Sequence, residues 1–154
     1  MAYFQNPEVS FEVPDDWVDQ TAVVYAERVG IGLPSTISLC RNAMPGSDTL
    51  QSRASAVSRK LVAELPDAKI LEENWLTINT VPAVQLLVEW KHHAGALTQL
   101  ITLFVRDGTF WSFTATVPSD RLGAIDPILQ AVLSSLQVTK PQQPLELVIP
   151  VRDT

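Results

Sequence analysis

The hydrophobic and polar positions of the chain form seven extended stretches and two segments of helical period. Alternating positions, or a run rich in β-branched residues, are typical of a strand. The turn at Asp107-Gly108 joins two such stretches and is a strong hairpin signal. We therefore predict strands over residues 9–13, 21–27, 36–41, 70–79, 83–91, 97–106 and 109–117.

Two segments have the three-or-four spacing of a helix with one buried face. In the first, from Thr49 to Leu65, the apolar residues Leu50, Ala54, Val57 and Leu61 recur at that spacing, and Pro66 ends the segment. For the second helix, Asp126 is a good cap and Pro127 suits the first helical position. The buried stripe predicted for this second helix consists of Leu129, Val132, Leu133 and Leu136.

The order of elements is three strands, a helix, four strands and a helix. Consecutive strands with short links pair antiparallel, and helices cover the apolar side of such a sheet. We therefore predict an α+β fold: one twisted antiparallel sheet of about six or seven strands, with two helices packed on one face. Residues 1–140 would form this single domain. Residues 141–154 would form a Pro-containing tail, either loose or with "LELVI" as an edge strand.

The hairpin over residues 97–117 has two unlike faces. Side chains alternate along a strand, so Trp111, Phe113, Ala115 and Val117 share one face, which we predict to be core. In the register that the Asp-Gly turn favours, Leu100, Thr102 and Phe104 lie beside them. In the preceding strand, we assign Val84, Leu86, Val88 and Trp90 to the same core.

The opposite face mixes apolar side chains with hydroxyls and amides. It is too apolar for open water and too polar for a dry core, because buried hydroxyls need partners. We interpret it as a binding surface for an apolar peptide or helix, with a homodimer seam or a cover formed by the C-terminal tail as alternatives. A shift of one residue in the "HHAGA" loop would exchange the faces of the strand before it. The predicted surface comprises Gln85, Leu87, Glu89, Gln99, Ile101, Leu103, Phe110, Ser112 and Thr114.

Composition and charge narrow the class of protein. The 154 residues are 46% hydrophobic and 18% charged, which indicates a globular chain. The net charge of −6 and the lack of a Lys/Arg cluster argue against nucleic-acid binding and against an anionic membrane. We find no secretory signal pattern and no long apolar run, so we expect no membrane insertion. With the lone Cys40, these features favour the cytoplasm.

No group of residues in the sequence indicates catalysis or a cofactor. The segment "RVGIGLP" lacks the rest of a phosphate-binding loop, and His92 and His93 would point to opposite faces of a strand. Cys40 lies mid-strand, where a small buried hydrophobe is the more common role. We therefore expect no enzyme activity, no metal and no cofactor.

The segment "FEVPDDWVDQTAVVY" resembles the N-terminal motif of the DcrB-related, PsbP-like proteins, in which Trp17, Asp19 and Gln20 are the most specific positions. The likeness extends in weaker form to about residue 138 and is closest to the Eag chaperones of type VI secretion. It implies a cytoplasmic homodimer without catalytic activity. Its partners would be the hydrophobic N-terminal transmembrane segments of a PAAR-containing effector, which it shields until the effector is loaded on the secretion spike.

The resemblance also implies positions for the client-binding groove. Two apolar groove positions fall on Ala22 and Val24, where the family has bulkier residues. A groove glutamine falls on Ile101, with Gln99 two residues away on the same face. An alternative from another class is a binder of lipid or another small apolar ligand that uses the same sheet face.

Overall fold

A computed structural model describes residues 2–5, 10–16, 22–29, 32–44 and 46–137. The chain divides into two compact units. One unit, Gln20–Gln137, contains the main sheet and both helices. The other combines Met1–Asp19 with Val138–Thr154, and its described part is a hairpin of β1 (Ala2–Gln5) and β2 (Ser10–Val13). The predicted tail, 141–154, lies outside the described residues.

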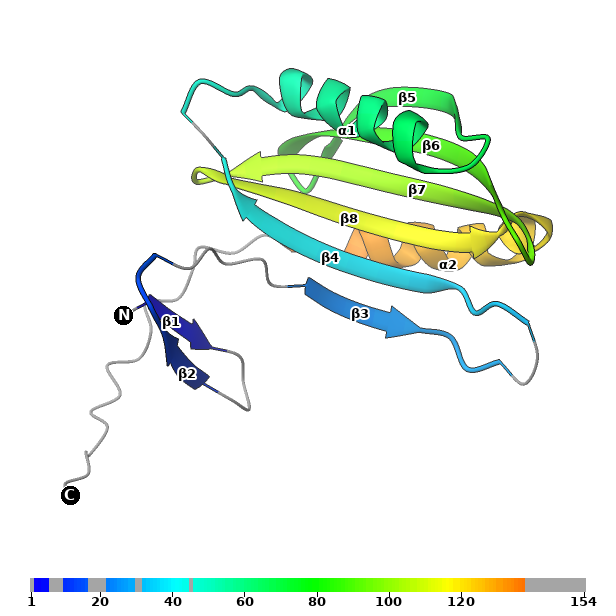
Figure 1. Cartoon of the computed structure of the whole chain (residues 1–154), viewed down its shortest axis with the longest axis horizontal. Helices are drawn as coiled ribbons and strands as arrows, with labels where there is room; N and C mark the ends of the chain where they lie inside the picture. The colour runs from blue at the N-terminus through cyan, green and yellow to red at the C-terminus, as the bar shows by residue number, and fades with distance from the viewer. Residues whose placement is uncertain (1, 6–9, 17–21, 30–31, 45, 138–154) are drawn as a thin grey trace. The chain divides into compact units, whose positions relative to one another are not determined.

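The main sheet has six antiparallel strands in the order β3-β4-β8-β7-β6-β5 (Figure 1). This confirms the predicted α+β class and the antiparallel sheet. Every predicted strand is present within a few residues of its expected ends, although β2 pairs with β1 and not with this sheet. The strands are β3 (Ala22–Ala26), β4 (Thr36–Ala43), β5 (Lys69–Ile78), β6 (Val81–His92), β7 (Gly95–Arg106) and β8 (Thr109–Pro118).

Strands β5 to β8 form a meander with tight turns. At the β7–β8 turn, Asp107 and Gly108 both have positive φ (50° and 73°), as the favoured two-residue hairpin turn requires. In the β5–β6 turn, φ is also positive at both residues, Asn79 (46°) and Thr80 (73°). Aspartate and asparagine tolerate this conformation, whereas a β-branched threonine is strained there.

Helix α1 (Leu50–Glu64) begins one residue after the predicted start, and Thr49 is its cap. The hydroxyl of Thr49 accepts the backbone N–H of Ser52 (3.1 Å), and the Ser52 hydroxyl accepts the N–H of Thr49 (2.9 Å). This reciprocal capping satisfies two donors that a helix start leaves unpaired. The helix packs on β5, β6 and β7, with Ala54 in contact with a cluster of buried residues. That cluster consists of Val84, Leu86, Val88, Ile101, Leu103 and Phe110.

Helix α2 (Leu122–Ser135) starts earlier than predicted. It follows the short 3-10 helix η1 (Ser119–Arg121), so Pro127 lies inside α2 and not at its first position. A proline there cannot donate to the carbonyl of Gly123, one turn earlier. Its buried residues are Ile125, Leu129 and Leu133, and the first two pack in a cluster with Ala115 and Val117 of β8.

The two helices lie on opposite faces of the sheet, and the prediction that they share one face is wrong. In the β7–β8 register, Ile101 pairs with Thr114 on the face that α1 covers, while Leu100 pairs with Ala115 on the face that α2 covers. Figure 1 shows α1 in front of the sheet and α2 behind it. Within the described residues, neither helix is long and apolar enough to cross a membrane.

Candidate functional site

Three rows of paired residues cross the sheet on the α1 face. The middle row runs Val24, Ser38, Thr114, Ile101 and Leu86, from β3 to β6. Each row changes character in the same way, from an exposed apolar residue on β3, through small or polar side chains on β4 and β8, to the buried core beneath α1. The flanking rows are Ala22, Cys40, Ser112, Leu103 and Val84, and Ala26, Thr36, Thr116, Gln99 and Val88.

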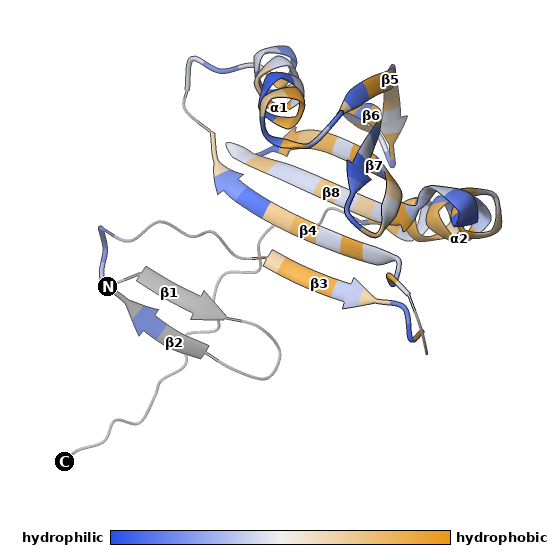
Figure 2. Ribbon diagram, turned by 45° about the vertical axis from the view of Figure 1, so that its right-hand side comes forward, coloured by the Kyte–Doolittle hydropathy of each residue, from blue (hydrophilic) through white to orange (hydrophobic). Residues whose placement is uncertain are grey.

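The half of this face away from α1 forms a surface that we call the strip. None of its residues carries a charge, although charged side chains are the usual covering of a surface sheet. Val24 is 63% exposed, and the residues on β4 and β8 are half-buried. Figure 2 shows β3 mostly in the hydrophobic colour, beside β4, where hydrophobic and pale bands alternate before a hydrophilic end, and the paler β8. The strip consists of Ala22, Val24, Ala26, Thr36, Ser38, Cys40, Gln99, Ser112, Thr114 and Thr116.

The polar groups of the strip have hydrogen-bonding capacity to spare. Gln99 donates its Nε2 to Thr116 Oγ1 (3.2 Å), and the hydroxyls of Ser112 and Thr114 lie 3.5 Å apart. The Gln99 Oε1 is buried and has no hydrogen-bond partner within the described part of the chain. An unpaired buried acceptor costs free energy, so rotation of the Gln99 side chain toward a donor on a bound molecule would be favoured.

The structure brings together five of the predicted surface residues on the strip: Ala22, Val24, Gln99, Ser112 and Thr114. Ile101, Leu103 and Phe110 lie on the predicted face but are at most 3% exposed, because α1 covers them. They form core and do not line an open groove.

Gln85, Leu87 and Glu89 lie on the opposite face, which corrects their predicted placement. The β6–β7 turn contains only His93 and Ala94, since His92 pairs with Gly95. This register pairs Leu86 with Ile101, so Val84, Leu86 and Val88 face α1 and not α2. A turn one residue longer would have given the predicted faces.

The prediction also missed strip residues on β4, above all Ser38 and Thr36. Their alternation with Ile37 and Leu39 was a usable signal, because it puts Thr36, Ser38 and Cys40 on one side of the strand. Cys40 is half-buried on the strip and is a free cysteine. Trp17, Asp19 and Gln20 of the resemblance motif lie outside the described residues.

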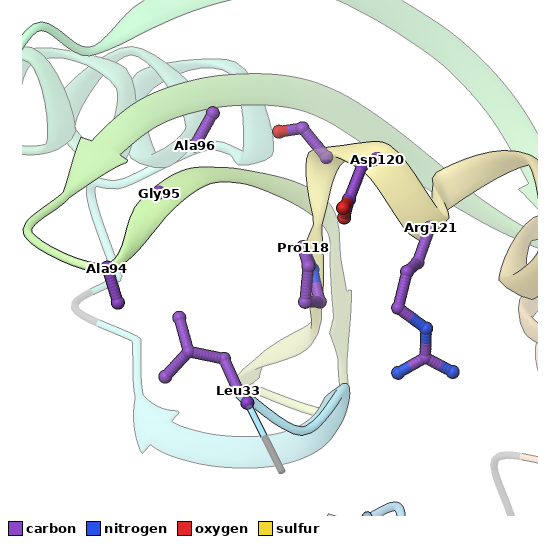
Figure 3. Close-up of a pocket in the computed structure, with 9 residues that line it drawn as sticks. Leu33, Ala94, Gly95, Ala96, Pro118, Asp120 and Arg121 are labelled. Atoms are coloured by element: carbon purple, nitrogen blue, oxygen red, sulfur yellow. The ribbon is translucent and has the colours of Figure 1, made fainter.

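A pocket of about 610 Å³ lies at one end of the sheet, among the loops that follow β3, β6 and β8 (Figure 3). Beside it, the Arg121 guanidinium is bound by both carboxylate oxygens of Glu27. These hydrogen bonds, with the backbone N–H of Ser35, lower the pKa of Glu27 from 4.5 to about 2. The charge of Arg121 is therefore already matched, and we assign the ion pair to holding the β3–β4 connection against η1.

Among the described residues, no three His, Cys, Asp or Glu side chains gather in a way that could hold a metal ion. His92 and His93 have ring centroids 3.9 Å apart, and the N–H of Ala94 donates to His92 Nδ1 (3.1 Å). That hydrogen bond gives the pair a role in shaping the tight turn.

Three solved structures share this fold. A protein of unknown function from Pseudomonas aeruginosa, described as a putative regulator, has 19% identity and a TM-score of 0.77 over 91% of this chain and 98% of its own. Cyanobacterial PsbP from Synechocystis sp. PCC 6803 has 12% identity and a TM-score of 0.56, with coverage of 90% and 92%. LpqN of Mycobacterium tuberculosis, involved in cell envelope biogenesis, has 16% identity and a TM-score of 0.57, with coverage of 77% and 76%.

At these identities the three structures show the PsbP-like fold alone. Comparison with curated proteins gave no match. The family model of DcrB, however, matches residues 8–135, which include the main sheet and both helices. Because that match covers most of the sequence, this chain belongs to the DcrB family.

Proposed function

We propose that this protein is a non-enzymatic chaperone of a type VI secretion system. It binds the hydrophobic N-terminal transmembrane segments of a PAAR-containing effector in the cytoplasm, keeps them soluble and helps to load the effector on the secretion spike. It acts as a homodimer. The proposal rests on the Eag-like sequence motif and on one structural observation, the uncharged strip on the α1 face.

The chemistry of the strip suits such a client. A transmembrane segment exposed to water costs about 25 cal/mol for each Å² of apolar surface, so covering it is strongly favourable. Membrane helices associate through small residues and through Ser, Thr and amide side chains. The strip offers the same kinds of group: small Ala22 and Ala26, the hydroxyls of Ser112 and Thr114, and the amide side chain of the half-buried Gln99.

The sharpest test uses two adjacent residues of β3. Val24 faces the strip and is 63% exposed, whereas Val23 faces the opposite side and is 45% exposed. We expect Val24→Glu to abolish co-purification with a co-expressed effector fragment that contains the PAAR region and its transmembrane segments. The matched variant Val23→Glu should retain the client, and both variants should keep the wild-type circular dichroism spectrum.

Equal client capture by the two variants would contradict the binding surface, and failure of the wild-type protein to solubilise the fragment would contradict the chaperone function. Native mass spectrometry of the purified protein tests the alternative of a lipid binder. A stoichiometric bound lipid would support that alternative, whereas an empty homodimer is the outcome that our proposal predicts.

A further inference from the structure

A pocket other than the one beside Arg121 lies on the face of the sheet that α2 covers, which is the face opposite to that of the strip. It is a pocket of about 420 Å³ between α2 and the sheet, where β5, β6 and β7 meet the helix. Its volume is within the range of small-ligand sites. Gln85 and Leu87, which the sequence had assigned to the client groove, line this pocket.

The floor of the pocket is aliphatic. Leu87 of β6 and Leu100 of β7 are cross-strand partners, and Leu122 is the first residue of α2. All three are half-buried, so each leaves part of its side chain available for contact. An aliphatic chain of a few carbons would find apolar contacts there.

The rim of the pocket is made of hydrogen-bond acceptors. Glu72 of β5 and Asp126 of α2 are both exposed carboxylates. Since a carboxylate only accepts, the amide nitrogens of Asn74 and Gln130 must turn toward them, at 3.3 Å and 3.4 Å. Gln85 likewise directs its nitrogen to Thr102 (3.2 Å). Each amide therefore retains its carbonyl oxygen as an acceptor.

We propose that this pocket binds an aliphatic ammonium or guanidinium group. Two carboxylates and three amide side chains make a polar ring rich in acceptors, and among the described residues none that lines the pocket is Lys, Arg or His. A cation with several N–H donors satisfies such a ring through charge-assisted hydrogen bonds, and its methylene chain covers the leucine floor. The site is independent of the strip, so it stands or fails separately from the proposed function.

Agmatine, which has an ammonium and a guanidinium joined by four methylenes, is a suitable probe. We expect it to shift the backbone amide resonances of Glu72, Gln85 and Asp126 in an NMR titration, while pentanol at the same concentration does not. The affinity should fall as salt is raised, because the pair of carboxylates is solvent-exposed. Agmatine that binds no better than pentanol would overturn the proposal.

A matched pair of variants tests the geometry. Glu72→Gln with Asp126→Asn should weaken agmatine binding at least tenfold. Glu73→Gln with Glu64→Gln removes the same number of charges outside the pocket, from the α1 face of β5 and from the end of α1, and should leave binding unchanged. Equal weakening by both would show that net charge alone attracts the cation, which refutes the site.

N-acetyl-arginine methylamide in place of agmatine distinguishes the two sources of such a cation. Comparable binding indicates that the natural ligand is a partner's arginine side chain, and weaker binding indicates a free small cation.

Discussion

Leu103 provides the most direct test of which part of the α1 face is core. Its side chain is fully buried beneath α1, in contact with a cluster that includes Ala54, Val84 and Phe110. Leu103→Ala removes its apolar contacts and leaves a cavity that the surrounding strands and helix fill only in part. Substitutions of this kind cost about 2–5 kcal/mol. A domain of ordinary stability, about 5–15 kcal/mol, would lose a large fraction of its free energy of unfolding.

Urea denaturation followed by circular dichroism measures this loss. We expect the midpoint to fall strongly at an unchanged slope, and the melting temperature to fall by roughly 10 °C or more. Val24→Ala is the matched control, since Val24 lies on the same face but is 63% exposed, and it should change stability by less than about 0.5 kcal/mol. A loss below about 1 kcal/mol for Leu103→Ala would refute the placement of α1 over this residue.

Two further substitutions test local features. Thr80→Gly should raise the free energy of unfolding by up to about 1 kcal/mol, because the φ of 73° at this position costs a β-branched residue more than it costs glycine. A lower urea midpoint for this variant would contradict the expectation. The pKa of Glu27 is lowered from 4.5 to about 2, so its ion pair with Arg121 stabilises the fold above pH 4.5, and the contribution is lost as the pH falls toward 2. The difference in urea midpoint between wild type and Glu27→Gln should therefore be largest near neutral pH and should shrink below pH 4.5. A difference that stays constant with pH would show that the ion pair does not stabilise the fold.

The strands and the first helix were predictable because local chemistry specifies them. The Asp107-Gly108 turn fixes the β7–β8 register, and Thr49 with Ser52 fixes the start of α1. The strand pattern needed no tertiary information, since the connections from β5 to β8 are short and each strand pairs with its neighbour in the chain.

The faces of β6 could not be predicted in the same way. Because helices cover both sides of the sheet, β6 and β7 bury apolar residues on both faces, and the pattern does not change when the register shifts by one. The wrong register put Gln85 and Leu87 beside Gln99. The start of α2 was missed for a related reason: Pro127 is favoured at a helix start, but packing of Ile125 against the sheet extends the helix back to Leu122.

Strand β3 has no buried side chain: all five of its residues are exposed. Its separation from β4 would break backbone hydrogen bonds but uncover none of the core, so local opening there costs far less than opening of the central strands. Amide hydrogen exchange along β3 should be fast while β7 remains protected. The sheet thus combines protected central strands with an edge strand that opens easily, and under the proposed function this edge would let the strip adjust to apolar segments of different width.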